Sequence, residues 1–75
     1  MSSKIYLRLE PRNIDMLTRI IEACSHLGVV STLDRRQGLV IIRGTPDTSP
    51  EIELLLPELP FPVERVIDVD LRRSL

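Results

Sequence analysis

Residues 4–28 read KIYLRLEPRNIDMLTRIIEACSHLG, and the spacing of the apolar side chains changes once along this stretch. Over residues 4–10 every second side chain is apolar, which is typical of a strand with one buried face. Over residues 14–27 the apolar side chains instead fall in one half of a helical wheel of about 100° per residue. Pro11 suits the first turn of this helix, and Gly28 suits a left-handed cap at its end. The stretch therefore predicts a strand followed by an amphipathic helix.

The next segments predict a β-hairpin. Residues 28–34 (GVVSTLD) and 39–43 (LVIIR) are rich in β-branched and other apolar side chains, and both suit strands. The polar residues 34–38 between them are typical of a hairpin loop, in which Gly38 is free to take a positive φ.

A second helix and a last strand follow the hairpin. Residues 48–51 (TSPE) match a capping box, in which the Thr48 hydroxyl accepts a hydrogen bond from the Glu51 N–H. The apolar stripe of the helix, which leaves out Leu54, consists of Ile52, Leu55, Leu56 and Leu59. Pro57 is expected to end or kink this helix, and residues 63–71 (VERVIDVDL) are expected to form a strand. The sequence leaves one cluster of prolines unexplained: Pro57, Pro60 and Pro62.

The order β-α-β-β-α-β predicts an α+β fold with residues 1–75 as a single domain. It is the order of the ferredoxin-like fold, in which right-handed crossovers place both helices on one face of a four-stranded antiparallel sheet. The expected order of the strands in space is 4-1-3-2. The result is a two-layer sandwich whose second sheet face has no helix on it.

The strand over 39–43 is apolar on both faces, with Leu39 and Ile41 on one and Val40 and Ile42 on the other. One of these pairs must therefore lie on the open face of the sheet. An exposed apolar sheet centre on so small a domain indicates a contact surface, so we expect self-association. The candidate interface consists of Tyr6, Arg8, Val30, Thr32, Val40 and Ile42.

Three phrases carry a resemblance to known families: LEPRNIDMLTRIIE (residues 9–22), LGVVSTLD (27–34) and GLV (38–40). They resemble a short bacterial family of uncharacterised function. The chain is more weakly similar to ACT domains, small βαββαβ modules that bind amino acids or similar effectors at subunit interfaces. The positions that fit the ACT outline are Glu10, Pro11, Ile14, Leu17 and Ile20.

The ACT-like resemblance implies a small-molecule effector near Glu10, Arg12 and Asn13, at the start of the first helix. Free N–H groups and a partial positive charge at that helix end suit a carboxylate. However, Arg12 and Asn13 stand where ACT domains carry the glycine that lets the backbone approach the effector.

Composition and charge exclude several other classes. Ten basic and eleven acidic residues give a net charge of −1, so no bulk attraction draws the chain to nucleic acid or to an anionic membrane. No apolar run reaches the length of a signal peptide or a membrane span. The lone Cys24 cannot form an intramolecular disulfide, which fits a cytoplasmic location.

No catalytic, metal-binding or cofactor-binding residues are assigned. Cys24 and His26 are about 200° apart on the helix, so they cannot act as a nucleophile and its base. Asp68 and Asp70 share a strand face but have no third ligand, which favours a solvated edge over a cation site. The 39–43 strand carries no aromatic residue to stack on bases, so an RNA-binding module is the least favoured interpretation.

The sequence thus favours a non-enzymatic module that acts through protein contact as a homodimer. The alternative is a regulatory domain that binds an amino acid or another small metabolite.

Overall fold

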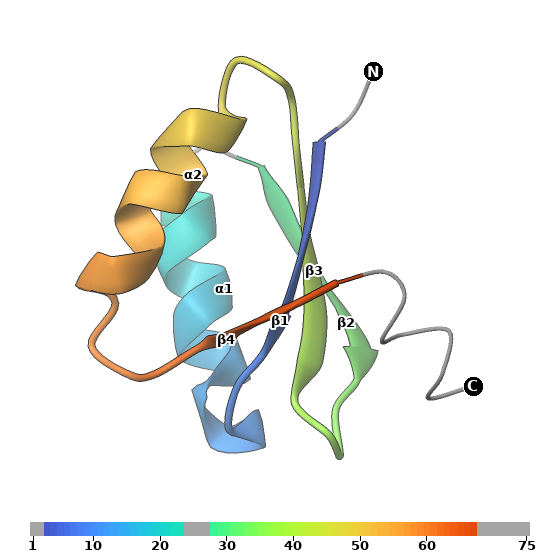
Figure 1. Cartoon of the computed structure of the whole chain (residues 1–75). Helices are drawn as coiled ribbons and strands as arrows, with labels where there is room; N and C mark the ends of the chain where they lie inside the picture. The colour runs from blue at the N-terminus through green and yellow to red at the C-terminus, as the bar shows by residue number, and fades with distance from the viewer. Residues whose placement is uncertain (1–2, 24–27, 68–75) are drawn as a thin grey trace.

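Four antiparallel strands form one sheet, and two α-helices lie on the same side of it (Figure 1). The computed structural model describes residues 3–23 and 28–67. The strands are β1 (Ser3–Arg8), β2 (Val29–Asp34), β3 (Leu39–Gly44) and β4 (Glu64–Val66), and the α-helices are α1 (Ile14–Ala23) and α2 (Ser49–Leu55). Their order in the sheet is β2-β3-β1-β4, which is the predicted order. The predicted α+β, ferredoxin-like fold is therefore confirmed.

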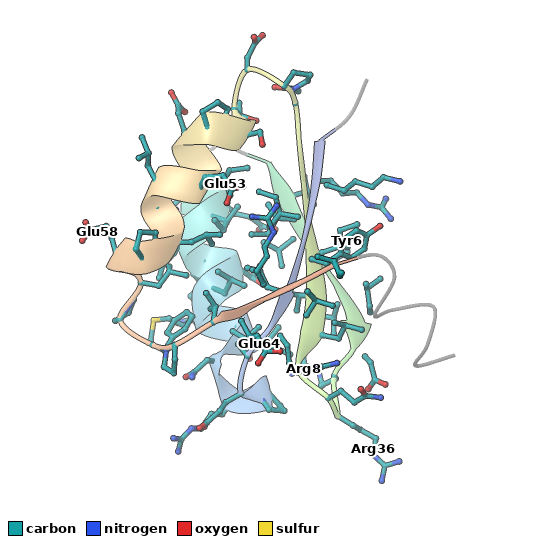
Figure 2. The ribbon with its side chains drawn as sticks, viewed as in Figure 1. Tyr6, Arg8, Arg36, Glu53, Glu58 and Glu64 are labelled. Atoms are coloured by element: carbon teal, nitrogen blue, oxygen red, sulfur yellow. The ribbon has the colours of Figure 1, made fainter. Side chains whose placement is uncertain are left out.

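The side chains of β1 alternate between the two faces of the sheet. Ile5 and Leu7 point to the helices and are buried. Tyr6 lies on the side of the sheet away from the helices, as Figure 2 shows. The antiparallel register pairs Leu7 with Val40, so Val40 also faces the helices.

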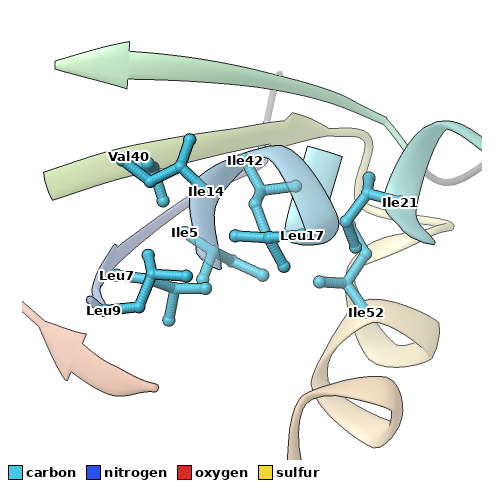
Figure 3. Close-up of a cluster of buried hydrophobic side chains, with 9 residues drawn as sticks. All are labelled: Ile5, Leu7, Leu9, Ile14, Leu17, Ile21, Val40, Ile42 and Ile52. Carbon is cyan, nitrogen blue, oxygen red and sulfur yellow. The ribbon is translucent and has the colours of Figure 1, made fainter. Parts of the chain in front are cut away.

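The core fills the space between the helices and this face of the sheet (Figure 3). Buried side chains come from β1, β3 and both helices: Ile5, Leu7, Leu9, Ile14, Leu17, Ile21, Val40, Ile42 and Ile52. In α1 the buried stripe is narrower than the predicted half-wheel, because Met16 is half-exposed. In α2 the prediction is confirmed, since Ile52 is buried while Leu54, off the stripe, is 75% exposed.

The predicted interface residues of β2 and β3 do not lie on the open face of the sheet, where they were expected. Val40 and Ile42 are fully buried beneath the helices. Val30 is opposite Ile42 in the register and Thr32 is opposite Val40, so both lie on the helix side as well. All four residues over 39–42 are apolar, so the sequence fits either pair facing the core. Pairing with β1 decides which two face the helices.

On the open face, Tyr6 is opposite Ile41 on one side and Val66 on the other. Leu39, Ile41 and Val66 are only 6%, 3% and 3% exposed. Among the described residues, the apolar side chains at the centre of this face are therefore not exposed, contrary to the expectation, and they give no reason for face-to-face self-association.

Two glycines permit close approaches of the backbone. Gly38, in the hairpin loop, takes φ 69° as predicted, and its carbonyl accepts a hydrogen bond from the Leu9 N–H at 2.9 Å. Gly28 has φ 158° rather than the left-handed cap of about 57°. A Cβ on Gly28 would overlap with the Arg43 carbonyl, so this glycine lets the start of β2 approach the end of β3. The predicted helix end over 24–27, with Cys24 and His26, lies outside the described residues.

The capping box predicted before α2 is wrong. Thr48 has helical backbone angles, φ −92° and ψ −19°, and its side chain makes no hydrogen bond to the helix N–H groups. Its hydroxyl accepts instead from the Thr45 N–H at 2.9 Å, so a turn closed by two threonines precedes the helix.

The α-helix ends before Pro57, as predicted, because proline lacks the N–H that the next turn needs. A short 3-10 turn, η2 (Leu56–Glu58), carries the chain past this residue. The last predicted strand is present as β4 but is shorter than expected, because Val63 and Ile67 are not part of it. Residues 68–71, with Asp68 and Asp70, lie outside the described residues.

Candidate functional site

A groove of about 650 Å³ lies beside α2. Its walls come from α2, η2, the loop over 59–63 and β4, and Leu7 of β1 joins it to the core. Apolar side chains dominate the lining, with one acid and one base among them: Leu7, Glu53, Leu56, Pro57, Leu59, Pro60, Phe61, Pro62, Val63 and Arg65. Its volume lies in the range of about 300–1,000 Å³ that is common for small-molecule sites.

The prolines that the sequence left unexplained form one wall of the groove. Leu59 leaves η2 in an extended conformation, φ −66° and ψ 145°, which the prolines after it maintain because their rings restrict φ. Exposure then alternates: Leu59, Phe61 and Val63 are partly buried against the core, whereas Pro60 and Pro62 are exposed. The prolines of this bent loop are therefore at exposed positions, while the residues between them pack inward.

An ion pair spans the polar part of the groove. Nη1 of Arg65 lies 2.7 Å from both carboxylate oxygens of Glu53, and the two side chains are 50% and 43% exposed. Figure 2 shows Glu53 on the inner side of α2, whereas Glu58 points away from the sheet. Within the described residues Nη2 and Nε of Arg65 donate no hydrogen bond. A half-exposed pair of this kind contributes only about 0.2–1 kcal/mol to stability.

The predicted effector residues come together in one turn, away from this groove. Glu10 precedes the 3-10 turn η1 (Pro11–Asn13), and the Asn13 N–H donates to the Glu10 carbonyl at 2.8 Å. The Arg12 guanidinium lies 2.6 Å from the Glu10 carboxylate, and both side chains are more than half exposed. None of these three residues lines the groove beside α2. An effector site at this turn stays a prediction.

The outer edge of β2 is a second candidate surface. β2 is six residues long, and among the described strands it pairs with β3 alone. Val29 and Leu33 are 57% and 46% exposed, and residues 29–33 contain neither a charge nor a proline. Exposed edge strands usually carry such protective residues. The β2 edge lacks them over 29–32, whereas an irregularity and the charge of Asp34 are at its end.

Of the predicted interface residues, Tyr6 and Arg8 remain on the open face of the sheet. Arg8 is opposite Glu64 in the register, and their charged groups are 3.6 Å apart (Figure 2). Near the same end of the sheet, Asp15 of α1 lies 3.6 Å from Arg35 of the hairpin loop. Neither pair is buried, so both are weak surface interactions.

The sheet order and the two helices define a small α+β domain of ferredoxin-like topology. The profile of a family described as a domain of unknown function, DUF4911, matches residues 7–63. The chain belongs to this family, which confirms the predicted membership of an uncharacterised family. No curated protein and no solved structure matches the chain. In the part of the chain that the structure describes, no helix is long and apolar enough to cross a membrane.

Sequence reasoning missed the residues that build the groove, above all Phe61, Glu53 and Arg65. One signal for the wall was available, because LPFPV over residues 59–63 places an apolar side chain at every second position between prolines. The ion pair joins residues twelve positions apart on a helix and a strand, and no local pattern indicates it.

Proposed function

We propose that the protein is a non-catalytic cytoplasmic module that acts through protein contact, and that its first partner is a second copy of itself. The observation that carries this proposal is the open outer edge of β2, with exposed Val29 and Leu33 and no protective charge or proline over 29–33. Unpaired N–H and C=O groups at such an edge are a template for another strand.

Identical strands suit this arrangement well. Two β2 strands that pair antiparallel about a two-fold axis present the same surface to each other, so the contact closes as a dimer. The two sheets then become one continuous sheet, and Val29 and Leu33 lose solvent contact near the ends of the new pair. The opposite edge is less suited because β4 is three residues long.

The proposal is tested by the oligomeric state of edge variants. Leu33→Lys places a charge on the edge, and Leu54→Lys is the control because Leu54 is the same residue type, is also exposed (75% against 46%) and lies on α2, away from the edge. We expect sedimentation velocity to give a dimer for the wild type and for Leu54→Lys, and a monomer for Leu33→Lys. Both substitutions are at exposed positions, so their unfolding midpoints should stay close to that of the wild type.

A wild type that sediments as a monomer up to submillimolar concentration would overturn the proposal. So would a Leu33→Lys variant that remains dimeric. If a charge at Tyr6 dissociates the dimer and Leu33→Lys does not, the open face is the interface instead.

A second function, binding of a small metabolite, is favoured by the groove beside α2. The turn of Glu10, Arg12 and Asn13 does not line this groove. A thermal-shift screen against amino acids and common metabolites tests binding as such, because a ligand at about 100 times its Kd stabilises a protein by about 2.7 kcal/mol.

A further inference from the structure

We propose that the groove beside α2 binds a small carboxylate with an apolar body, and that Arg65 is the residue that recognises the carboxylate. This proposal rests on the second function above, binding of a small metabolite in this groove, and does not depend on self-association. It rests on three features of the groove: its apolar walls, the free donors of Arg65 and the competing charge of Glu53.

The apolar walls suit the body of such a ligand. Leu56 and Phe61 are partly buried side chains that already pack against the core, so they present fixed apolar surface to the groove. Pro57 and Pro60 add rigid surface that loses little entropy when a ligand orders it. An apolar body of six to ten carbon atoms, on the order of a phenylalkyl group, fits the volume of about 650 Å³.

Arg65 is suited to bind the carboxylate of such a ligand. It is the only cation among the described residues that line the groove. Glu53 takes just one nitrogen of the guanidinium, Nη1, through two contacts of 2.7 Å. The edge formed by Nε and Nη2 has the spacing for a bidentate carboxylate, which is the geometry that arginine recognises best. Because Arg65 is half-exposed, a ligand can reach this edge without opening the fold.

Glu53 allows a test that distinguishes an anionic from a cationic ligand. Its carboxylate repels a second carboxylate on Arg65, so removal of its charge should tighten the binding of an anion. A ligand recognised through an ammonium group would use Glu53 as its counter-ion, and the same substitution would weaken it. Glu53→Gln therefore separates the two classes of ligand by the direction of the change.

The experiment is a titration of the full chain with 4-phenylbutyrate, followed by heteronuclear NMR, with the neutral amide of the same acid as the matched probe. We expect the carboxylate to shift the amide signals of residues 61–65 and the neutral probe to bind about tenfold more weakly or worse. Arg65→Gln should lower the affinity for the carboxylate to that of the neutral probe. Glu53→Gln should raise it about two- to fivefold, and Glu58→Gln, which changes a carboxylate that points away, should leave it unchanged.

Equal affinity for the two probes, or weaker binding by Glu53→Gln, would overturn the proposal. So would the absence of any shift up to the solubility of the acid, or shifts confined to residues 10–13. Because Arg65→Gln also removes an ion pair, its unfolding midpoint is compared with that of Glu53→Gln, which removes the same pair but predicts the opposite change in affinity.

Discussion

Replacement of Gly38 by alanine should destabilise the fold more than any other single change in the hairpin loop. Gly38 has φ 69°, a left-handed conformation that costs an L-residue about 1–2 kcal/mol. A Cβ at this position would lie 2.8 Å from the carbonyl carbon of Leu9 and closer still to its oxygen. Relief of that overlap must move backbone, and overpacking of this kind costs about 1–3 kcal/mol more.

The expected loss for Gly38→Ala is therefore about 2–5 kcal/mol, a large share of the 5–15 kcal/mol that stabilises a typical domain. For a domain of this size the melting temperature should fall by more than about 10 °C. The measurement is urea unfolding followed by far-ultraviolet circular dichroism, with all variants at one protein concentration because dimerisation would shift the midpoint. Arg36→Ala, in the same loop and with its side chain in solvent, is the control and should lie within about 0.5 kcal/mol of the wild type.

Gly38→Asn separates the two causes. Asparagine tolerates positive φ much better than alanine but carries the same Cβ. If contact with the Leu9 carbonyl dominates, the asparagine variant is nearly as unstable as the alanine variant. A loss below about 1 kcal/mol for Gly38→Ala would refute the reasoning, because it would mean that the backbone near Leu9 moves away from the new Cβ with little loss of stability.

Two further substitutions test the loop and the core. Asp34→Ala removes the carboxylate that accepts hydrogen bonds from two backbone N–H groups and from the side chain of Gln37. Urea unfolding should show a loss of about 1 kcal/mol. Asp34→Asn should lose less stability because it keeps one acceptor oxygen. Ile42→Asp places a charge in the core and should abolish the native circular dichroism spectrum, whereas Leu54→Asp should leave the unfolding midpoint nearly unchanged because that side chain is 75% exposed.

The order of the elements was predictable because the period of the apolar side chains changes at Pro11 and again after the hairpin. The role of Gly38 was predictable for a similar reason, since a polar loop between two β-rich runs needs a residue with a positive φ. Both are local properties of the chain, and the structure confirms both.

The inward face of β3 was not predictable from the strand itself. LVIIR has apolar side chains on both faces, so the strand alone does not show which side chains face the core. Pairing with β1 decides this, because Leu7 is opposite Val40. The candidate interface included Val40 and Ile42 for this reason, and both are core residues. The capping box failed for a related reason, because Thr45 competes for the Thr48 hydroxyl.

The two proposals use opposite edges of one sheet. The order β2-β3-β1-β4 separates the pairing edge from the groove at β4 by about 14 Å, three strand spacings. Pairing of two β2 strands therefore leaves both grooves at the outer ends of the joined sheet, where each remains open. Any coupling between the two sites must be reciprocal, so a ligand that strengthened dimerisation would also bind the dimer more tightly. Because β3 and β1 are held rigidly between the sites by a buried core, we expect no such coupling, and Leu33→Lys should bind 4-phenylbutyrate with the affinity of the wild type. A difference of tenfold or more would mean that the sheet transmits strain from one edge to the other, and the groove would then be a regulator of assembly.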